Sequence, residues 1–242
     1  MSKKTHNKNS KSPANSCSTL STFLQTIREL IPDDDKDNIY CFRGQAVSNW
    51  TISSSRSRYK VLDSPEVLRE MYTDVIQNYP SDFNCIEKLS YEDLAKMQHY
   101  GIPTDLIDVS LNPLVALFFA TEKDKGKNGV QSGIVYMFKI PKKFTEYKTS
   151  EAIFSTENTN IEENRFIKTN YSNERIRCQV GAFIYLNNTE SLKEWICHTI
   201  IIQNIAKIKI RKELERINIS YKTLFPELSE FHRALKARFY NN

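Results

Sequence analysis

The chain has 242 residues, of which 40% are hydrophobic and 26% charged, with a net charge of +5. This balance is ordinary for globular proteins, so it excludes a wholly disordered or fibrous chain and favours a single domain. No run approaches the roughly 20 apolar residues that cross a bilayer, and the N-terminus lacks the apolar core of a secretory signal. We therefore expect a cytoplasmic protein that does not bind a membrane.

The cysteines and histidines do not form a recognisable framework. The five cysteines are odd in number and widely spaced, without a C-x-x-C, so we expect reduced thiols. The four histidines are dispersed, which argues against a metal site. The chain also lacks G-x-x-x-x-G-K-[ST], G-x-G-x-x-G and G-x-S-x-G. These absences remove the simplest nucleotide-hydrolase, Rossmann and serine-hydrolase interpretations.

The first segments along the chain are a tail, a helix and a strand. Residues 1–17 are rich in Ser, Asn and Lys, and we expect a disordered basic tail there, followed by one domain over 18–242. Apolar residues at helical spacing over 20–30 predict a helix that ends before Pro32. The apolar run 39–42 predicts a buried strand that carries Arg43 at its end.

Capping residues mark the next helices. Ser64-Pro65-Glu66 predicts a helix start, and Ser90 with Asp93 forms a capping-box pattern whose helix ends at Gly101. Residues 106–109 are too short for a helix and predict a strand. Asn112-Pro113 then begins a helix that is apolar nearly all round over 114–120, so it must be buried on several sides.

The second half of the chain alternates strands with less regular segments. Strands are predicted at 133–138, 182–186 and 199–202, a short helix around 160–168, and a helical region over 207–240 that breaks near 225–226. The fold class is therefore α+β. We expect a single domain with short strands in a mixed or antiparallel split sheet flanked by helices.

Four separated segments resemble the FRG domain family, which is named for Phe-Arg-Gly. They are residues 42–45 (FRGQ) with Trp50 and Arg58, residues 98–120 beginning QHYGIPT, residues 175–183, and residues 224–226 (LFP). Together they span about 40–230 in order. The resemblance implies a bacterial or phage protein, often encoded near defence genes, and it does not supply a mechanism.

This chain departs from the family pattern at three places. It has Asp105 where the family usually has Arg, Val109-Ser110 where Trp-Thr is usual, and Ser54 where Pro is common. The loss of an arginine beside the signature would weaken an anionic site if one lies there.

A second resemblance is to the layout of ADP-ribosyltransferases, which implies NAD as the bound small molecule. In that layout an arginine opens the site, a serine motif follows before a buried helix, and a Glu or Gln comes later; the matching positions are Arg43, Ser110 and Gln179. Arg43 would anchor the nucleotide through its rigid fork of donors. Gln179 would contact the ribose, but it is neutral, so Asp108 would have to supply the negative charge.

The resemblance gives two sets of candidate site residues. The catalytic candidates are Arg43, Asp108, Ser110 and Gln179. The candidates for binding NAD are Arg43, Gly44, Gln45, Arg58, His99, Tyr100 and Asn112.

Each candidate also has a structural interpretation. Arg43 at a strand end would pair with Asp108 and tie two strands together. His99 next to a helix end would favour the helix dipole rather than catalysis. Ser110 and Asn112 are typical helix-start residues, and Gly44 needs only backbone freedom.

A different class of function stays open beside the enzyme. The basic tail and the pI near 8.8 also fit a non-catalytic module that binds nucleic acid or a partner protein in phage defence. Binding that weakens with salt would indicate the nucleic-acid version. The enzyme hypothesis requires Arg43, Asp108 and Gln179 to meet at one concave pocket.

Overall fold

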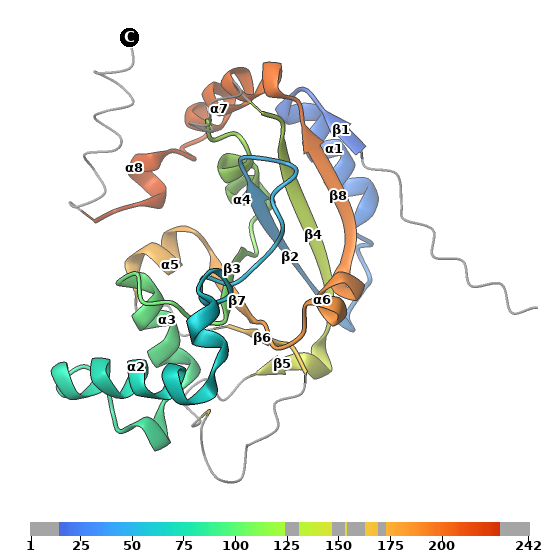
Figure 1. Ribbon diagram of the computed structural model, residues 1–242. Helices are drawn as coiled ribbons and strands as arrows, with labels where there is room; N and C mark the ends of the chain where they lie inside the picture. Colours follow the sequence, from blue (N-terminus) through green and yellow to red (C-terminus); the bar gives the residue numbers. More distant parts are fainter. Residues whose placement is uncertain (1–14, 124–130, 147–152, 154–162, 169–172, 228–242) are drawn as a thin grey trace, which may run out of the picture.

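The computed structural model describes residues 15–123, 131–146, 153, 163–168 and 173–227. Within these residues the strands form one mixed sheet in the order β1-β8-β4-β2-β3-β7-β6-β5 (Figure 1). The pairs β1–β8 and β5–β6 are parallel and the others antiparallel. The strand bounds are β1 Asn15–Cys17, β2 Asn38–Gln45, β3 Leu106–Ser110, β4 Gly133–Pro141, β5 Thr145–Glu146, β6 Arg165–Ile167, β7 Gly181–Tyr185 and β8 Ile196–Ile202.

Helices flank this sheet, which confirms the α+β class (Figure 1). The α-helices are α1 Leu20–Leu30, α2 Pro65–Asn78, α3 Tyr91–His99, α4 Pro113–Ala120, α5 Glu174–Cys178, α6 Thr189–Trp195, α7 Lys207–Arg216 and α8 Tyr221–Leu224. The 3-10 helices are η1 Arg56–Arg58, η2 Lys60–Asp63, η3 Ile86–Lys88, η4 Lys142–Phe144 and η5 Asn204–Ala206. No helix in the described ranges is long and apolar enough to span a bilayer.

The predicted helix starts are confirmed. The Ser64 hydroxyl accepts the backbone N–H of Val67 at the start of α2. At α3, Ser90 and Asp93 form the reciprocal capping box. The Asn112 side chain accepts the N–H of Leu114 at 2.9 Å, with Pro113 in the first turn of α4. Each cap satisfies a backbone donor that the helix itself leaves unpaired.

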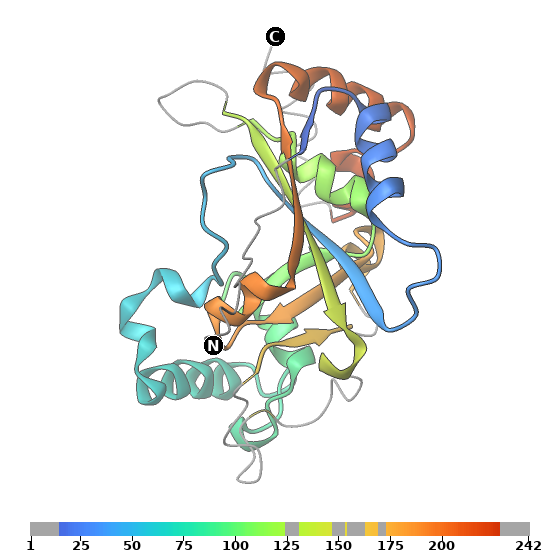
Figure 2. The same ribbon diagram turned by 90° about the vertical axis from the view of Figure 1, so that its right-hand side faces the viewer.

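The sheet is nearly divided between β2 and β3. These strands share one register pair, Phe42 with Ser110, whereas β2 pairs with β4 along its whole length and β3 pairs with β7 along its own. The strands change direction between the two halves (Figure 2). The predicted split sheet is therefore present, and its opening lies at the ends of β2 and β3.

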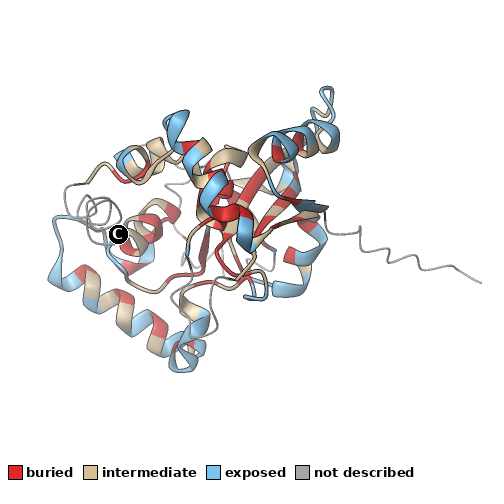
Figure 3. Cartoon of the chain, turned by 90° about the horizontal axis from the view of Figure 1, so that it is seen from above, coloured by how far each residue is buried: buried red, intermediate tan, exposed pale blue. Residues whose placement is uncertain are grey.

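Two hydrophobic clusters cover the same face of the two halves. Phe42 and Ser110 are opposite each other in the sheet, so every second side chain counted from Phe42 along β2 and from Ser110 along β3 lies on the same face. The cluster around α4 includes Phe42, Ala116 and Phe118, and the cluster around α3 includes Leu94, Leu106 and Phe183. A third cluster, with Cys41, Ile107 and Trp195, covers the other face. Figure 3 shows the buried residues concentrated in the sheet and on the inner helix faces.

Two sequence predictions are wrong within the described residues, and a third is incomplete. Residues 15–17 belong to β1 rather than to a tail, because they pair with β8 and Cys17 is buried; residues 1–14 lie outside the description. Residues 165–167 form β6 instead of part of a helix, since Phe166 and Ile167 are buried against β7. In the C-terminal helical region, α8 ends at Leu224 as expected for a break near 225–226, but the region has an earlier, unpredicted break at 217–220, where Asn218 has a φ of 65°; residues 228–242 lie outside the description.

Gly44 fixes how closely α4 packs on β2. A Cβ at this position would lie 1.8 Å from the backbone oxygen of Ala116 and 2.8 Å from the nitrogen of Ala120. Both contacts are with helix backbone, which cannot rotate away as a flexible side chain would. Glycine is therefore required at position 44 because a side chain would not fit there. At Gly101 no atom lies within 4 Å of the Cβ position, so glycine is favoured there only by its backbone φ of +85°.

We predict that Gly44→Ala lowers the free energy of unfolding by about 3 kcal/mol or more, because α4 must move away from the sheet. Gly101→Ala is the matched control and should lower the free energy of unfolding by about 1 kcal/mol, because alanine is strained in a left-handed backbone conformation. Urea unfolding followed by circular dichroism measures both values. Equal losses in the two variants would contradict the close packing of α4.

Candidate functional site

A cavity of about 280 Å³ lies where β2 and β3 diverge, between α3, α4 and α5. The cavity lies between the α4 cluster and the α3 cluster. β2 and β3 share a single register pair, so the sheet opens there, and the helices that pack on the two halves do not cover the opening. The polar residues that line it are Arg43, Gln98, His99, Asp108, Ser110, Arg175 and Gln179. The sequence candidates Arg43, Asp108, Ser110 and Gln179 therefore meet at one cavity.

Arg43 lines this cavity from β2. Its Nη1 donates a 2.7 Å hydrogen bond to the backbone oxygen of Asp108, so it ties β2 to β3 through the main chain. The alternative of an ion pair with the Asp108 carboxylate does not occur. Burial lowers the pKa of Arg43, and its Nε is enclosed without a hydrogen-bond partner among the described residues. A guanidinium remains charged in proteins, so Arg43 brings positive charge to the site.

Asp108 is the carboxylate of the cavity. Asp108 is exposed, and Gln98 Nε2 donates a hydrogen bond to one of its carboxylate oxygens at 2.9 Å. Gln98 is oriented in turn by Thr104, whose hydroxyl donates to the Gln98 side-chain oxygen at 2.5 Å. Thr104 is buried and its hydroxyl also accepts the N–H of Leu106. This chain of bonds holds the Asp108 side chain in one orientation at the cavity.

Ser110 joins three parts of the structure. Its hydroxyl donates to the backbone oxygen of Gln179 at 2.6 Å and accepts the N–H of Asn112 at 3.0 Å. Ser110 is only 5% exposed, and its backbone pairs with Gly181 of β7. The hydroxyl therefore links the end of β3, the start of α4 and the turn after α5.

Gln179 follows α5 rather than lying on a strand. It caps α5, and its side-chain amide donates to the backbone oxygen of Leu224 at 3.0 Å. Its Nε2 thus binds the C-terminal segment, while the residue still lines the cavity. Val180, next to it, has a φ of 46°, which turns the chain sharply into β7.

His99 and Glu227 lie together at the edge of the site. His99 ends α3 and lines the cavity, and its Nε2 is 3.9 Å from a carboxylate oxygen of Glu227. Both oxygens of Glu227 are enclosed without hydrogen-bond partners in the part of the chain that the structure describes. His99, which was predicted to favour the dipole at the end of its helix, therefore has Glu227 as an acidic neighbour.

Arg175 lies on α5 and lines the cavity. Its guanidinium carbon lies 4.6 Å from the centre of the Phe225 ring, a cation–π distance. No ion pair to Arg175 occurs among the described residues, whereas Arg177 on the same helix pairs with Glu174 at 3.0 Å. Arg175 was not among the catalytic or NAD-binding candidates.

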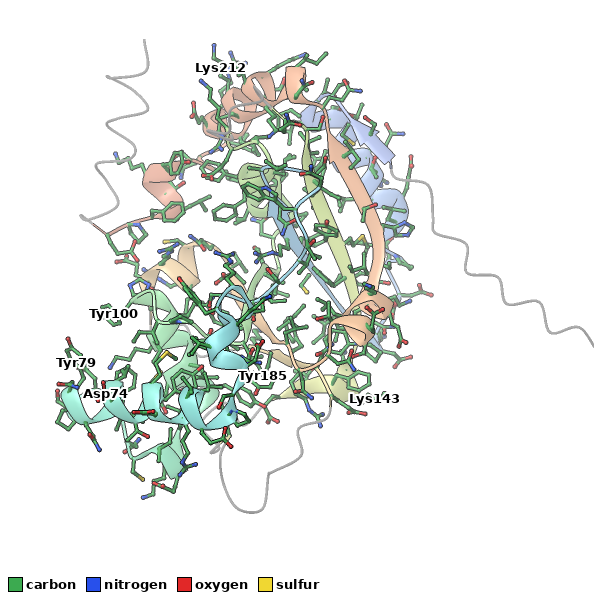
Figure 4. The ribbon with its side chains drawn as sticks, in the orientation of Figure 1. Asp74, Tyr79, Tyr100, Lys143, Tyr185 and Lys212 are labelled. Carbon is green, nitrogen blue, oxygen red and sulfur yellow. The ribbon has the colours of Figure 1, made fainter. Side chains whose placement is uncertain are left out.

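Four candidates lie outside the cavity lining. Gln45 is buried with its side-chain oxygen unpaired in the described chain. Arg58 is exposed on η1, although its charge still acts on Arg43. Tyr100 is 72% exposed at the outer surface beside α3 (Figure 4). Asn112 is occupied as the cap of α4.

Asp105, a departure from the usual family residue, does not face this cavity. It is 7% exposed and accepts a 2.6 Å hydrogen bond from Arg56 Nε within an ion pair. Burial raises the pKa of Asp105, while Arg56 opposes that rise. Asp105 therefore belongs to a separate polar pocket lined also by Tyr72 and Tyr185.

Comparison with known families agrees with the sequence signature. The model of the FRG domain matches residues 38–129, from β2 past α4. The chain carries an FRG domain. No curated protein and no solved structure matches the chain.

The FRG match covers only part of the cavity. Arg43, Gln98 and Asp108 lie within the matched residues, whereas Arg175 and Gln179 come after them. The FRG signature thus builds the opening of the sheet and the network around Asp108. Later segments complete the wall formed by α5.

Sequence reasoning missed three residues at or beside the site. Gln98 was part of the QHYGIPT signature, and its spacing of ten residues from Asp108 gave no sign of their contact. Arg175 belonged to the third resembling segment, but an arginine on an amphipathic helix is typical of a surface. Glu227 follows the LFP segment, and nothing local to it indicates His99.

We predict that Ser110→Ala lowers the free energy of unfolding by about 2 kcal/mol, because it leaves two partly buried backbone groups, the Gln179 oxygen and the Asn112 N–H, without this partner. The matched control is Thr73→Ala, which removes an exposed hydroxyl bond to the oxygen of Arg69 and should change stability by less than about 0.5 kcal/mol. Urea unfolding measures both. A Ser110→Ala loss as small as that of the control would contradict the linking role of Ser110.

Proposed function

We propose that this FRG-domain protein binds NAD in the β2–β3 cavity and acts as an ADP-ribosyltransferase or NAD glycohydrolase. The observation that carries the proposal is the meeting of Arg43, Asp108, Ser110 and Gln179 at one cavity, from segments far apart in the chain. Pockets that combine apolar walls with a few convergent polar groups are typical ligand sites.

The cavity size suits one half of the dinucleotide. Its volume of about 280 Å³ lies just below the range of roughly 300–1,000 Å³ found for small-molecule pockets. Phe119, Ile176 and Phe183 supply an apolar lining that suits the nicotinamide ring. The adenosine half would extend out of the opening, with Arg43 near the phosphates.

The reaction breaks the bond between ribose C1′ and the nicotinamide nitrogen. Nicotinamide leaves with the bonding electron pair, and positive charge develops on the ribose. An oxygen nucleophile, from water or a target side chain, then bonds to C1′ and releases its proton. A carboxylate placed near C1′ stabilises the developing charge more than it stabilises the ground state.

Asp108 is the residue that we assign to this role. Its carboxylate lines the cavity, and one oxygen is held by Gln98. A carboxylate held in advance does not have to reorient during the reaction, which is the condition for strong electrostatic catalysis. Gln179, whose amide nitrogen is bound to Leu224, offers its side-chain oxygen to a ribose hydroxyl.

We predict that the purified chain releases nicotinamide from NAD and that Asp108→Asn lowers this rate by about 100-fold, as removal of a charge-stabilising group does. The affinity for NAD should stay within a few-fold, since the amide keeps the shape of the carboxylate. Chromatography of nicotinamide and calorimetric titration with NAD give the two values.

Asp82→Asn is the control for this experiment, because Asp82 is an exposed carboxylate paired with Lys96 away from the cavity lining. It should leave the release of nicotinamide unchanged. Absence of any heat of binding at millimolar NAD, together with no release of nicotinamide, overturns the proposal.

A further inference from the structure

Arg175 has no role in the function proposed above, although it lines the same cavity. Its guanidinium carbon lies 4.6 Å from the Phe225 ring centre, so an aromatic face covers one side of the group. The ring also packs on Phe119, with centroids 6.0 Å apart, which fixes it against α4. The N–H groups at the guanidinium edge are therefore left to bind a partner in its plane.

The segment Leu224–Glu227 supports this wall of the cavity at three points. The Leu224 oxygen accepts the side-chain amide of Gln179, Phe225 lies against Arg175, and Glu227 lies beside His99. Three cavity residues from α3 and α5 thus depend on one short segment.

The charges at the cavity are unequal. Arg43 and Arg175 bring two guanidinium groups, and neither has an ion pair with a carboxylate among the described residues. Asp108 lines the same space, where Gln98 binds one of its oxygens and its negative charge acts on Arg43. Glu227 lies at the edge, beside His99. An anion bound in the cavity would be attracted by both guanidinium groups.

We propose that Arg43 and Arg175 are the two sides of a diphosphate-binding clamp, and that the substrate class of the cavity is a nucleoside diphosphate derivative. Each planar fork binds the oxygens of one phosphate group in a two-pronged manner. The clamp joins the FRG-matched part of the chain, through Arg43, to the later α5 segment. The identification of the derivative as NAD rests on the proposed function; the clamp itself does not.

The test compares Arg175→Gln with Arg177→Gln in the full chain. Arg177 is on the same helix, 63% exposed in its side chain and paired with Glu174, so it controls for loss of charge on α5. Calorimetric titrations use ADP-ribose, which carries the diphosphate, and adenosine, which lacks it. Circular dichroism and the urea midpoint establish that each variant is folded.

We expect Arg175→Gln to weaken binding of ADP-ribose by about 10- to 100-fold, the loss of a hydrogen-bonded charge pair. Arg177→Gln should leave it within about two-fold, as a surface charge does. Adenosine should bind all three proteins alike. Phe225→Leu, which keeps apolar volume but removes the ring, should weaken ADP-ribose binding by a smaller factor.

The outcomes separate the clamp from the transferase. Equal affinity of wild type and Arg175→Gln for ADP-ribose, or no binding of ADP-ribose by the wild type, overturns the clamp. Release of nicotinamide from NAD in that case leaves the proposed function standing. Binding of ADP-ribose that depends on Arg175, with neither binding of NAD nor release of nicotinamide, supports the clamp and overturns the transferase.

Discussion

The single pairing between Phe42 and Ser110 is the constraint on which the site depends. β2 continues alone with β4 beyond this pair, and β3 with β7, so a gap opens in the sheet between β2 and β3. Each side of the gap needs its own helices to cover its apolar face, α4 on one half and α3 on the other. A cavity remains between them because neither helix covers both halves.

The gap is held at a fixed width by polar bonds rather than by sheet pairing. Arg43 reaches across it to the main chain of Asp108, and Ser110 connects β3 to the turn after α5. The close contact of Gly44 with α4 fixes the opposite edge. Hydrogen bonds to enclosed backbone groups are costly to leave unmade. The same side chains therefore serve the fold and point toward the cavity, and a structural role does not exclude a functional one.

Much of the fold could be predicted because its signals are local. The caps at Ser64, Ser90 and Asn112 and the apolar run over 114–120 each determine an element within a few residues. Residues 165–167 were wrongly assigned to a helix, because their burial comes from pairing with β7, about twenty residues later. The break at 217–220 likewise depends on Asn218 adopting a left-handed backbone. Long-range pairing and rare backbone angles leave little trace in local composition.

The same distinction explains the site. Arg43, Asp108 and Ser110 were found from the order of motifs, which reflects chain topology, whereas Gln98 and Arg175 required coordinates. Gln98 meets Asp108 only because α3 packs against β3, and Arg175 faces the cavity only because Phe225 lies against its other side. A motif therefore locates the opening in the sheet, but the charge balance inside it is set by tertiary contacts. Among the residues that line the cavity, two guanidinium groups stand against the carboxylate of Asp108, with Glu227 at the edge beside His99, and this excess of positive charge in the lining favours an anionic ligand.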